Sequence, residues 1–179
     1  MSGTNLREEP EIGEPSAEKW VRYVSGGNFL KWYGNLDYKL KDAFDEMRQL
    51  RGSAIRNQDL WFREGVTYCK LSSKGFNARL LPQGFVFSSG GNCTFSETEA
   101  VTPYDMLGLL NSRLAQYMLN QINPTVNYQT GDVERIPVPL RWGDTLRKKS
   151  ESAVNLARSL SRNRRDLKGF EPCHGSFFD

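Results

Sequence analysis

The chain is poor in the residues from which catalytic and metal sites are most often built. It has one histidine, His174, close to its end, and three cysteines among 179 residues. The cysteines, Cys69, Cys93 and Cys173, are too few and too scattered for a disulfide framework or a zinc site. Reduced thiols are the ordinary interpretation, and they are typical of the cytoplasm. We therefore predict no bound metal and a cytoplasmic location.

Long apolar runs and cofactor motifs are missing as well. No stretch approaches the roughly 20 apolar residues of a membrane span, and the first residues lack the apolar segment of a signal peptide. No GxGxxG follows a strand pattern, and neither a P-loop nor HExxH occurs. Asn123-Pro124 is followed by Thr125-Val126, which departs from the Asn-Pro-Pro-Tyr tetrad with which amino-methylating enzymes hold a flipped base. We predict that the chain contacts no membrane, binds no cofactor and catalyses no reaction by itself.

The chain does have enough apolar surface for one folded domain with appendages. Hydrophobic residues make up 38% of it and aromatic residues 12%, which disfavours disorder. The net charge of +3 does not by itself indicate nucleic acid. We divide the chain into a flexible arm (1–16), an α+β domain (17–140), a basic helix (141–170) and a tail (171–179).

Residue spacing predicts the secondary structure. Alternation over 65–89, with turns at 72–75 and 82–84, predicts a three-stranded antiparallel meander. Helices are predicted over 40–50, over 102–120 with Thr102 as the cap, and in the basic segment. Apolar residues recur about every seven positions in that last helix and form a narrow seam. The seam residues are Leu146, Ala153, Leu156, Leu160 and Leu167. The predicted fold class is α+β, an antiparallel sheet packed by helices, with a long C-terminal helix.

Two segments have the chemistry of a DNA-reading surface, in which cations hold phosphates while amide and guanidinium groups reach base edges. In the hairpin of the meander, the candidate residues are Lys70, Ser72, Ser73, Lys74, Asn77 and Arg79. If the alternation holds, Asn77 and Arg79 share one outward face of the second strand. The alternative is the solvated face of an ordinary sheet, with Arg79 in a structural ion pair.

The second segment is "NPTVNYQTGD", which reads as a loop. Its candidate residues are Asn127, Gln129 and Thr130, whose polar groups alternate with Tyr128. The alternative is that these side chains satisfy local backbone groups. The basic C-terminal helix is either a solvated face or a further contact with phosphates.

Four stretches carry a resemblance to known proteins: "NFLKWYGNLDY", "WFREGVTYCKLSSKGFNARLLPQGFVFSSGG", "MLGLLNSRLAQYMLNQINPTVNYQTGDVERIPVP" and "NRRDLKGFEPCHGSFFD". In order and spacing they resemble the C-terminal half of large adenine-specific DNA methyltransferases. These include the type IIG restriction-modification enzymes and the methyltransferase of the BREX phage-exclusion system. The following positions match the family's turn and strand, its helix pair and its loop: Ser72, Ser73, Lys74, Phe76, Ala78, Arg79, Asn111, Ser112, Asn127, Gln129, Gly131 and Asp132. The tail departs from the family at Leu167, Pro172-Cys173 and His174.

The resemblance implies a target-recognition part that grips duplex DNA beside the base to be methylated. The partner would be a methyltransferase catalytic domain missing from this chain, so we expect a fragment or relic without activity alone. The alternative is a protein-interaction module whose C-terminal helix pairs in a homodimer or docks on the catalytic domain. An enzyme with an unrecognised site is a further alternative.

Overall fold

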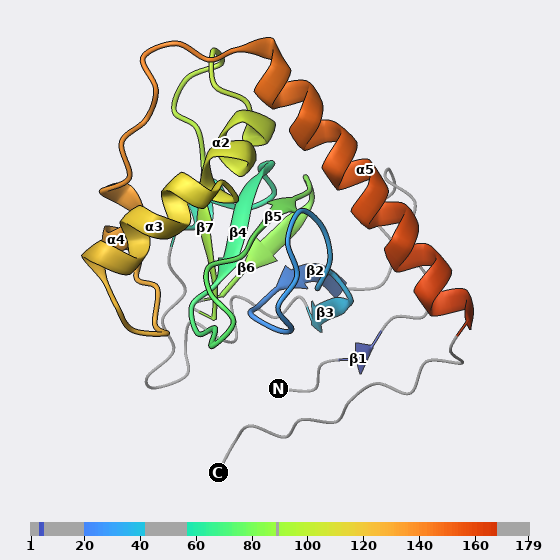
Figure 1. The fold of residues 1–179 in the computed structure, drawn as a ribbon. Coiled ribbons are helices and arrows are strands. Elements are labelled where there is room, and N and C mark those ends of the chain that lie inside the picture. Colours follow the sequence, from blue (N-terminus) through green and yellow to red (C-terminus); the bar gives the residue numbers. More distant parts are fainter. Residues whose placement is uncertain (1–3, 6–19, 42–56, 89, 168–179) are drawn as a thin grey trace.

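The computed structural model describes residues 4–5, 20–41, 57–88 and 90–167. Most of the predicted arm, nearly all of the predicted helix over 40–50 and the whole tail fall outside these residues. The strands are β1 (Thr4–Asn5), β2 (Trp20–Val24), β3 (Tyr38–Lys41), β4 (Gly65–Cys69), β5 (Ala78–Leu81), β6 (Phe85–Phe87) and β7 (Gly91–Thr94). The helices are α2 (Pro103–Leu110), α3 (Arg113–Ile122), α4 (Thr130–Glu134) and α5 (Asp144–Leu167), with a 3-10 turn, η1 (Gln58–Leu60). The α+β class with a long C-terminal helix is confirmed (Figure 1).

The strands form two small sheets, with orders β1-β3-β2-β6 and β5-β4-β7. The antiparallel β4–β5 hairpin was predicted, and β7 pairs antiparallel with the other edge of β4. The prediction that β6 continues a meander is wrong, because β6 pairs parallel with β2 in the other sheet. Its Phe85 packs there in a small apolar cluster with Val24 and Leu81. Turn residues show where the chain reverses, but they do not show which sheet the next strand joins.

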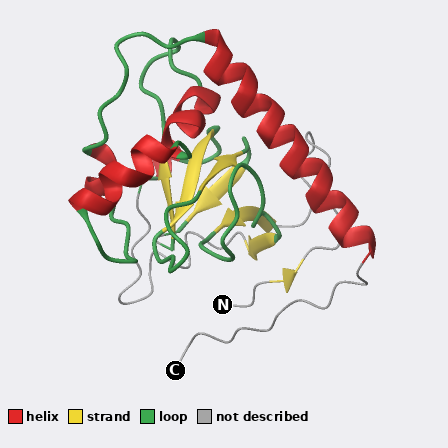
Figure 2. Cartoon of the chain, viewed as in Figure 1, coloured by secondary structure: helices red, strands yellow, loops and turns green. Residues whose placement is uncertain are grey.

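The β5-β4-β7 sheet is a middle layer. One face carries Val66, Tyr68, Ala78 and Leu80, which pack with residues of α2, α3 and α5 in the main core. The other face carries Leu81 toward the second cluster, beside β6 and β2. Figure 2 shows the strands at the centre with helices along their flank. Both β4 and β5 are therefore buried on both faces.

The predicted helix over 102–120 is two helices, with a break at Asn111-Ser112. The predicted start is correct, because Thr102 caps α2 and forms a capping box with Asp105. At the break, the Asn111 amide accepts from the Ala78 backbone N–H at 3.1 Å and donates to the Ala78 carbonyl at 2.9 Å. The Ser112 hydroxyl then caps α3. Apolar periodicity continues across the break, so the pattern alone did not reveal it.

Helix α5 packs on α2 through a close approach at Gly108. A β-carbon at Gly108 would lie 2.5 Å from the Ser150 hydroxyl and 2.8 Å from Leu146 Cδ1. Further along α5, Val154 is buried in the main core and the Arg158 guanidinium lies 4.8 Å from the centroid of the Tyr33 ring.

The predicted seam of α5 is wrong in part. Leu156 and Leu160 are 62% and 56% exposed. Ser150 and Val154, which are buried, stand four residues apart and continue the contact made by Leu146. This spacing follows the 3.6-residue turn of a straight helix rather than the seven-residue repeat of a coiled coil.

A buried ion pair fastens α5 to α2. Arg147 donates to the Asp105 carboxylate, with Nη2 at 2.8 Å and Nε at 3.1 Å from Oδ2. The Asp105 side chain is fully buried, whereas the Arg147 side chain is one-third exposed. Burial acts to raise the pKa of Asp105, but hydrogen bonds from Arg147 and Thr102 outweigh it, and the pKa falls below its usual value.

We predict that Asp105→Asn lowers the free energy of unfolding at neutral pH by about 1–3 kcal/mol, because Arg147 loses its charged acceptor. The folded-state pKa of Asp105 lies below the unfolded value of about 3.9, so the pair's contribution is complete above that value. It is lost as the pH falls through the folded-state pKa. Urea unfolding at several pH values should therefore show wild type and Asp105→Asn converging in acid. Glu99→Gln, at an exposed position, is the control. A difference in unfolding free energy between wild type and Asp105→Asn that stays the same at every pH would contradict the prediction.

Candidate nucleic-acid interface

The two predicted segments, far apart in the sequence, lie side by side. Leu71 and Asn127 form an antiparallel bridge. The Ser72 N–H donates to the Val126 carbonyl at 2.9 Å, and the Tyr128 N–H donates to the Lys70 carbonyl at 2.7 Å. In Figure 1 the loop after α3 comes down beside the turn that follows β4. We call residues 70–75 and 125–130 the turn–loop junction.

The turn half of the junction is held by short hydrogen bonds. Gly75 has a φ of +98°, a backbone conformation that residues with a β-carbon rarely adopt. The Ser72 hydroxyl donates to the Gly75 carbonyl at 2.7 Å. The Phe76 N–H donates to the Gln116 side chain of α3 at 2.9 Å. The turn is thus fixed both internally and against a helix.

The loop half is organised by Asn123, which ends α3. Its amide nitrogen donates to the Asn127 carbonyl at 2.9 Å and to Asp132 Oδ2 at 2.6 Å, and its amide oxygen accepts from the Thr125 N–H at 3.0 Å. Asp132 also accepts from the Gln129 N–H at 3.0 Å. The hydrogen bonds from Asn123 and Gln129 lower the pKa of Asp132. Residues 130–134, which the sequence predicted to be part of a loop, form the short helix α4.

Seven of the nine predicted site residues belong to this junction. Ser73, Lys74, Gln129 and Thr130 are exposed, and Lys70, Ser72 and Asn127 are partly exposed. Neither 65–81 nor 120–131 contains an aspartate or glutamate. The junction therefore presents two lysines, hydroxyls and two amide side chains without a carboxylate in its own segments.

The other two predicted residues, Asn77 and Arg79, do not lie on an outward face. Both are fully buried, so the expectation of an exposed reading face on β5 is wrong. The Arg79 Nη1 donates to Asn77 Oδ1 at 2.8 Å and contacts Cys69 Sγ at 3.1 Å. The alternation of side chains is real, but the second face of β5 meets protein instead of water.

Arg79 is one end of a row of three side chains that crosses the sheet inside the molecule. On the three paired strands it stands opposite Thr67, which stands opposite Cys93. Burial raises the pKa of the Cys93 thiol to about 12, against the opposing effects of a hydrogen bond with Thr67 and of the Arg79 charge. Within the described residues, Arg79 Nε and Nη2 have no hydrogen-bond partner. Among the residues that the structure describes, Arg79 therefore has neither the solvent contact that the sequence predicted nor the ion pair that was the alternative.

Sequence reasoning missed two kinds of residue at the junction. Leu71 and Val126 are 66% and 51% exposed there. Asn123 and Gln116 are structural partners of the loop and the turn. The position of Asn123 just before Pro124 indicates a helix end, but no local signal predicts that its amide joins the loop to α4.

The described part of the chain lacks both a metal-binding cluster and a membrane-spanning helix. It holds no cluster of three or more histidine, cysteine, aspartate or glutamate side chains placed to bind a metal. None of its helices is long and apolar enough to cross a membrane.

Comparison with known proteins relates the chain to a class of enzymes. It is 35% identical over 142 residues to the adenine-specific methyltransferase BrxX of Escherichia coli O9:H4 (strain HS), covering 74% of this chain and 12% of BrxX. It is 32% identical over 162 residues to the adenine-specific methyltransferase PglX of Lacticaseibacillus casei (strain Zhang), covering 85% of this chain and 13% of PglX. Over most of its length, this chain is homologous to these adenine-specific methyltransferases.

The homology confirms the resemblance to adenine-specific methyltransferases. The chain spans only 12% and 13% of the lengths of BrxX and PglX. The homology therefore does not assign the activity of those whole proteins to this chain. No protein-family model matches the chain.

We predict that Asn123→Ala raises the pKa of Asp132 toward its ordinary value, because the carboxylate loses its main hydrogen-bond donor. A pH titration of the Asp132 carboxyl by NMR measures the change. The control, Asn120→Ala, removes an amide one helical turn earlier, which accepts a hydrogen bond from Gln116. It should leave the pKa of Asp132 unchanged. Equal effects of the two substitutions would show that Asn123 does not organise the loop.

Proposed function

We propose that this chain is the DNA target-recognition portion of a BREX-type, phage-exclusion adenine-specific methyltransferase and is not catalytic by itself. The observation that carries the proposal is the turn–loop junction. It joins two segments that the sequence marks separately and exposes Lys74, Gln129 and Thr130 with no carboxylate in either segment. The homology to BrxX and PglX supports a DNA-modifying context.

In this proposal each group at the junction has a separate task. Lys70 and Lys74 contact phosphates, which supplies affinity and sets the register of the protein on the duplex. Ser73 and Thr130 donate hydroxyl hydrogen bonds to the backbone, and the Gln129 amide reads a base edge, adenine being the base it suits best. Asn77 and Arg79 stay inside and support the hairpin. The partners are duplex DNA and a methyltransferase catalytic domain.

We predict that replacing both Lys70 and Lys74 by Gln weakens binding to duplex DNA. It should flatten the plot of log affinity against log salt by about two, since each lysine that neutralises a phosphate contributes about one to the slope. Fluorescence anisotropy with a labelled duplex at several salt concentrations measures both effects.

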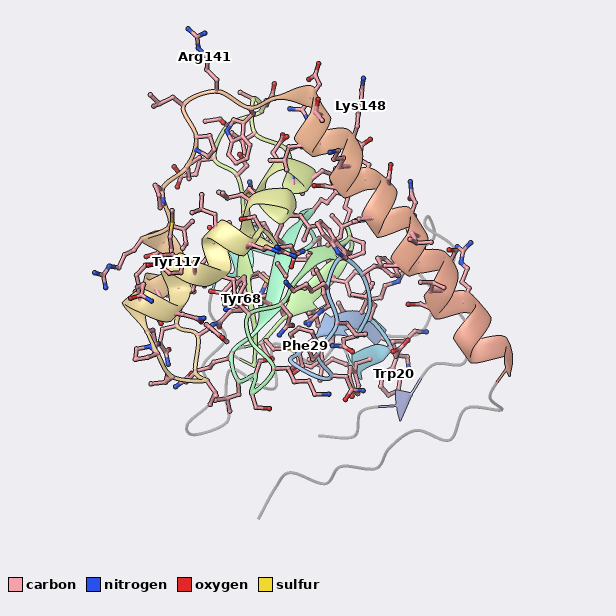
Figure 3. All side chains as sticks on the ribbon, in the orientation of Figure 1. Trp20, Phe29, Tyr68, Tyr117, Arg141 and Lys148 are labelled. Atoms are coloured by element: carbon pink, nitrogen blue, oxygen red, sulfur yellow. The ribbon has the colours of Figure 1, made fainter. Side chains whose placement is uncertain are left out.

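The matched control removes the same charge elsewhere. Lys148 and Lys149 are exposed on α5, and Lys148 points outward far from the junction in Figure 3. Replacing these two by Gln should leave the slope nearly unchanged. An equal loss from either pair would assign the binding to overall charge, and no binding by the wild-type chain at low salt would reject the proposal.

A second candidate function is a protein-interaction module, and the outer face of α5 favours it. Leu156 and Leu160, one helical turn apart, are both more than half exposed. Such a pair on a long helix is suited to packing against another helix. In this case α5 docks on the catalytic domain or on a second copy of the chain.

For the second candidate we predict self-association that is insensitive to salt and is lost in Leu156→Asp, because the contact is apolar. Sedimentation velocity across protein concentrations measures it. Ser152→Asp, at another exposed position of α5, is the control for added charge. A sedimentation coefficient typical of a monomer at all concentrations would contradict the homodimer.

A further inference from the structure

The positive charge of Arg79 is buried without a counter-charge among the described residues. Its Nη1 contacts the Asn77 amide oxygen and the Cys69 thiol, while Nε and Nη2 have no hydrogen-bond partner there. Segments 20–36 and 65–96, which hold its backbone partners, contain no aspartate or glutamate. A buried charge is costly unless an opposite charge compensates it. This guanidinium therefore favours an anion at the nearest surface.

A chain of hydrogen bonds leads from Arg79 to a backbone N–H. The Arg79 Nη1 donates to Cys69 Sγ at 3.1 Å, and the Cys69 thiol donates to the Gly27 carbonyl at 3.5 Å. In a trans peptide the C=O and N–H bonds point in opposite directions, and none of the described peptide bonds is cis. The Asn28 N–H therefore points away from the thiol. Hydrogen bonds in a chain polarise one another, which makes this N–H a stronger donor.

The Asn28 N–H belongs to an exposed loop that is held in place. Gly27 and Asn28 are exposed, and this N–H has no acceptor in the described part of the chain. Gly27 has a φ of +117°, and a β-carbon there would lie 2.9 Å from Asn35 Cγ. The Asn35 amide donates to the Asn28 carbonyl at 2.9 Å. The loop thus presents a free donor in a fixed direction.

The same loop borders the turn–loop junction. The Gly90 carbonyl accepts from the Lys70 N–H at 3.3 Å. A β-carbon at Gly26 would lie 3.0 Å from that carbonyl oxygen. Because Lys70 is the first residue of the junction, the loop extends the surface that carries the lysines.

We propose that the Asn28 N–H, beside Lys70, binds a phosphate of the DNA backbone, and that buried Arg79 is a positioning residue whose charge favours the phosphate there. This inference rests on the proposed DNA-binding function and adds a contact outside the two segments predicted from the sequence. Backbone N–H groups are regular donors to DNA phosphates. Arg79 acts through protein rather than water, and charges interact more strongly in that medium.

Asp132 places a negative charge next to the loop half of the junction. Hydrogen bonds from Asn123 and Gln129 occupy its Oδ2 and lower its pKa, so it is ionised at neutral pH. Asn28, in contrast, borders the turn half, which begins at Lys70. The phosphate is thus placed at the half of the junction that carries both lysines.

Two pairs of variants of the full chain test the contact, by fluorescence anisotropy with a labelled duplex across salt concentrations. Asn28→Pro removes the N–H at a residue whose φ is not positive. It should weaken binding about tenfold, as expected for a hydrogen bond to a charged group, whereas Asn28→Ala keeps the N–H and should stay within about twofold of wild type. Arg79→Met should flatten the plot of log affinity against log salt by about one, and Arg79→Lys, which keeps the charge, should not. Circular dichroism shows whether each variant is folded.

The outcomes separate the phosphate contact from the proposed function. No binding by the wild-type chain at low salt would reject DNA binding itself. Binding that depends on Lys70 and Lys74 but is unchanged in Asn28→Pro and in folded Arg79→Met would retain that function and overturn the phosphate contact. Equal losses in Asn28→Pro and Asn28→Ala would also overturn it, because the N–H would then have no part. If Arg79→Met does not fold, the two Asn28 variants decide.

Discussion

A hairpin with both faces and both edges covered can meet a partner only through its turn. Helices cover one face of β4 and β5, and the second apolar cluster lies against the other. The edge of β4 that faces away from β5 pairs with β7. The outer edge of β5 pairs with the backbone of Trp32 through hydrogen bonds of 2.8 and 2.9 Å. The strands that the sequence marks as a reading face are therefore a support. The part that remains accessible is the turn, together with the loop that is bonded to it.

The same constraint explains why two polar, buried side chains occur in and just before β5. Arg79 and Asn77 satisfy part of each other's hydrogen-bonding capacity, and Cys69 takes one further contact. Removing a polar group from water without a partner costs free energy, and two nitrogens of Arg79 bear that cost. Arg79 stays buried because protein packs on both faces of β5. The position of the junction, which continues this hairpin, therefore depends on the packing of the core.

The sequence predicted local structure well and its surroundings poorly. The β4–β5 turn around Gly75, the Thr102 cap and the long basic helix all follow from chemistry within a few residues, and all are present. The burial of Arg79, the exposure of Leu156 and the transfer of β6 to the second sheet depend on which element lies across from each. Alternation and periodicity reveal that a face exists without revealing what covers it. For the site, each segment was found separately, but the bridge between Leu71 and Asn127 that unites them has no local signal.

The most direct measurement of the central claim is a map of backbone amide chemical shifts in the full chain as duplex DNA is added. The account predicts that the largest changes lie in 70–75 and 125–130, with small changes in the interior of β4 and β5 and on the outer face of α5. Shift changes concentrated around Leu156 and Leu160, with the turn and the loop unaffected, would contradict it.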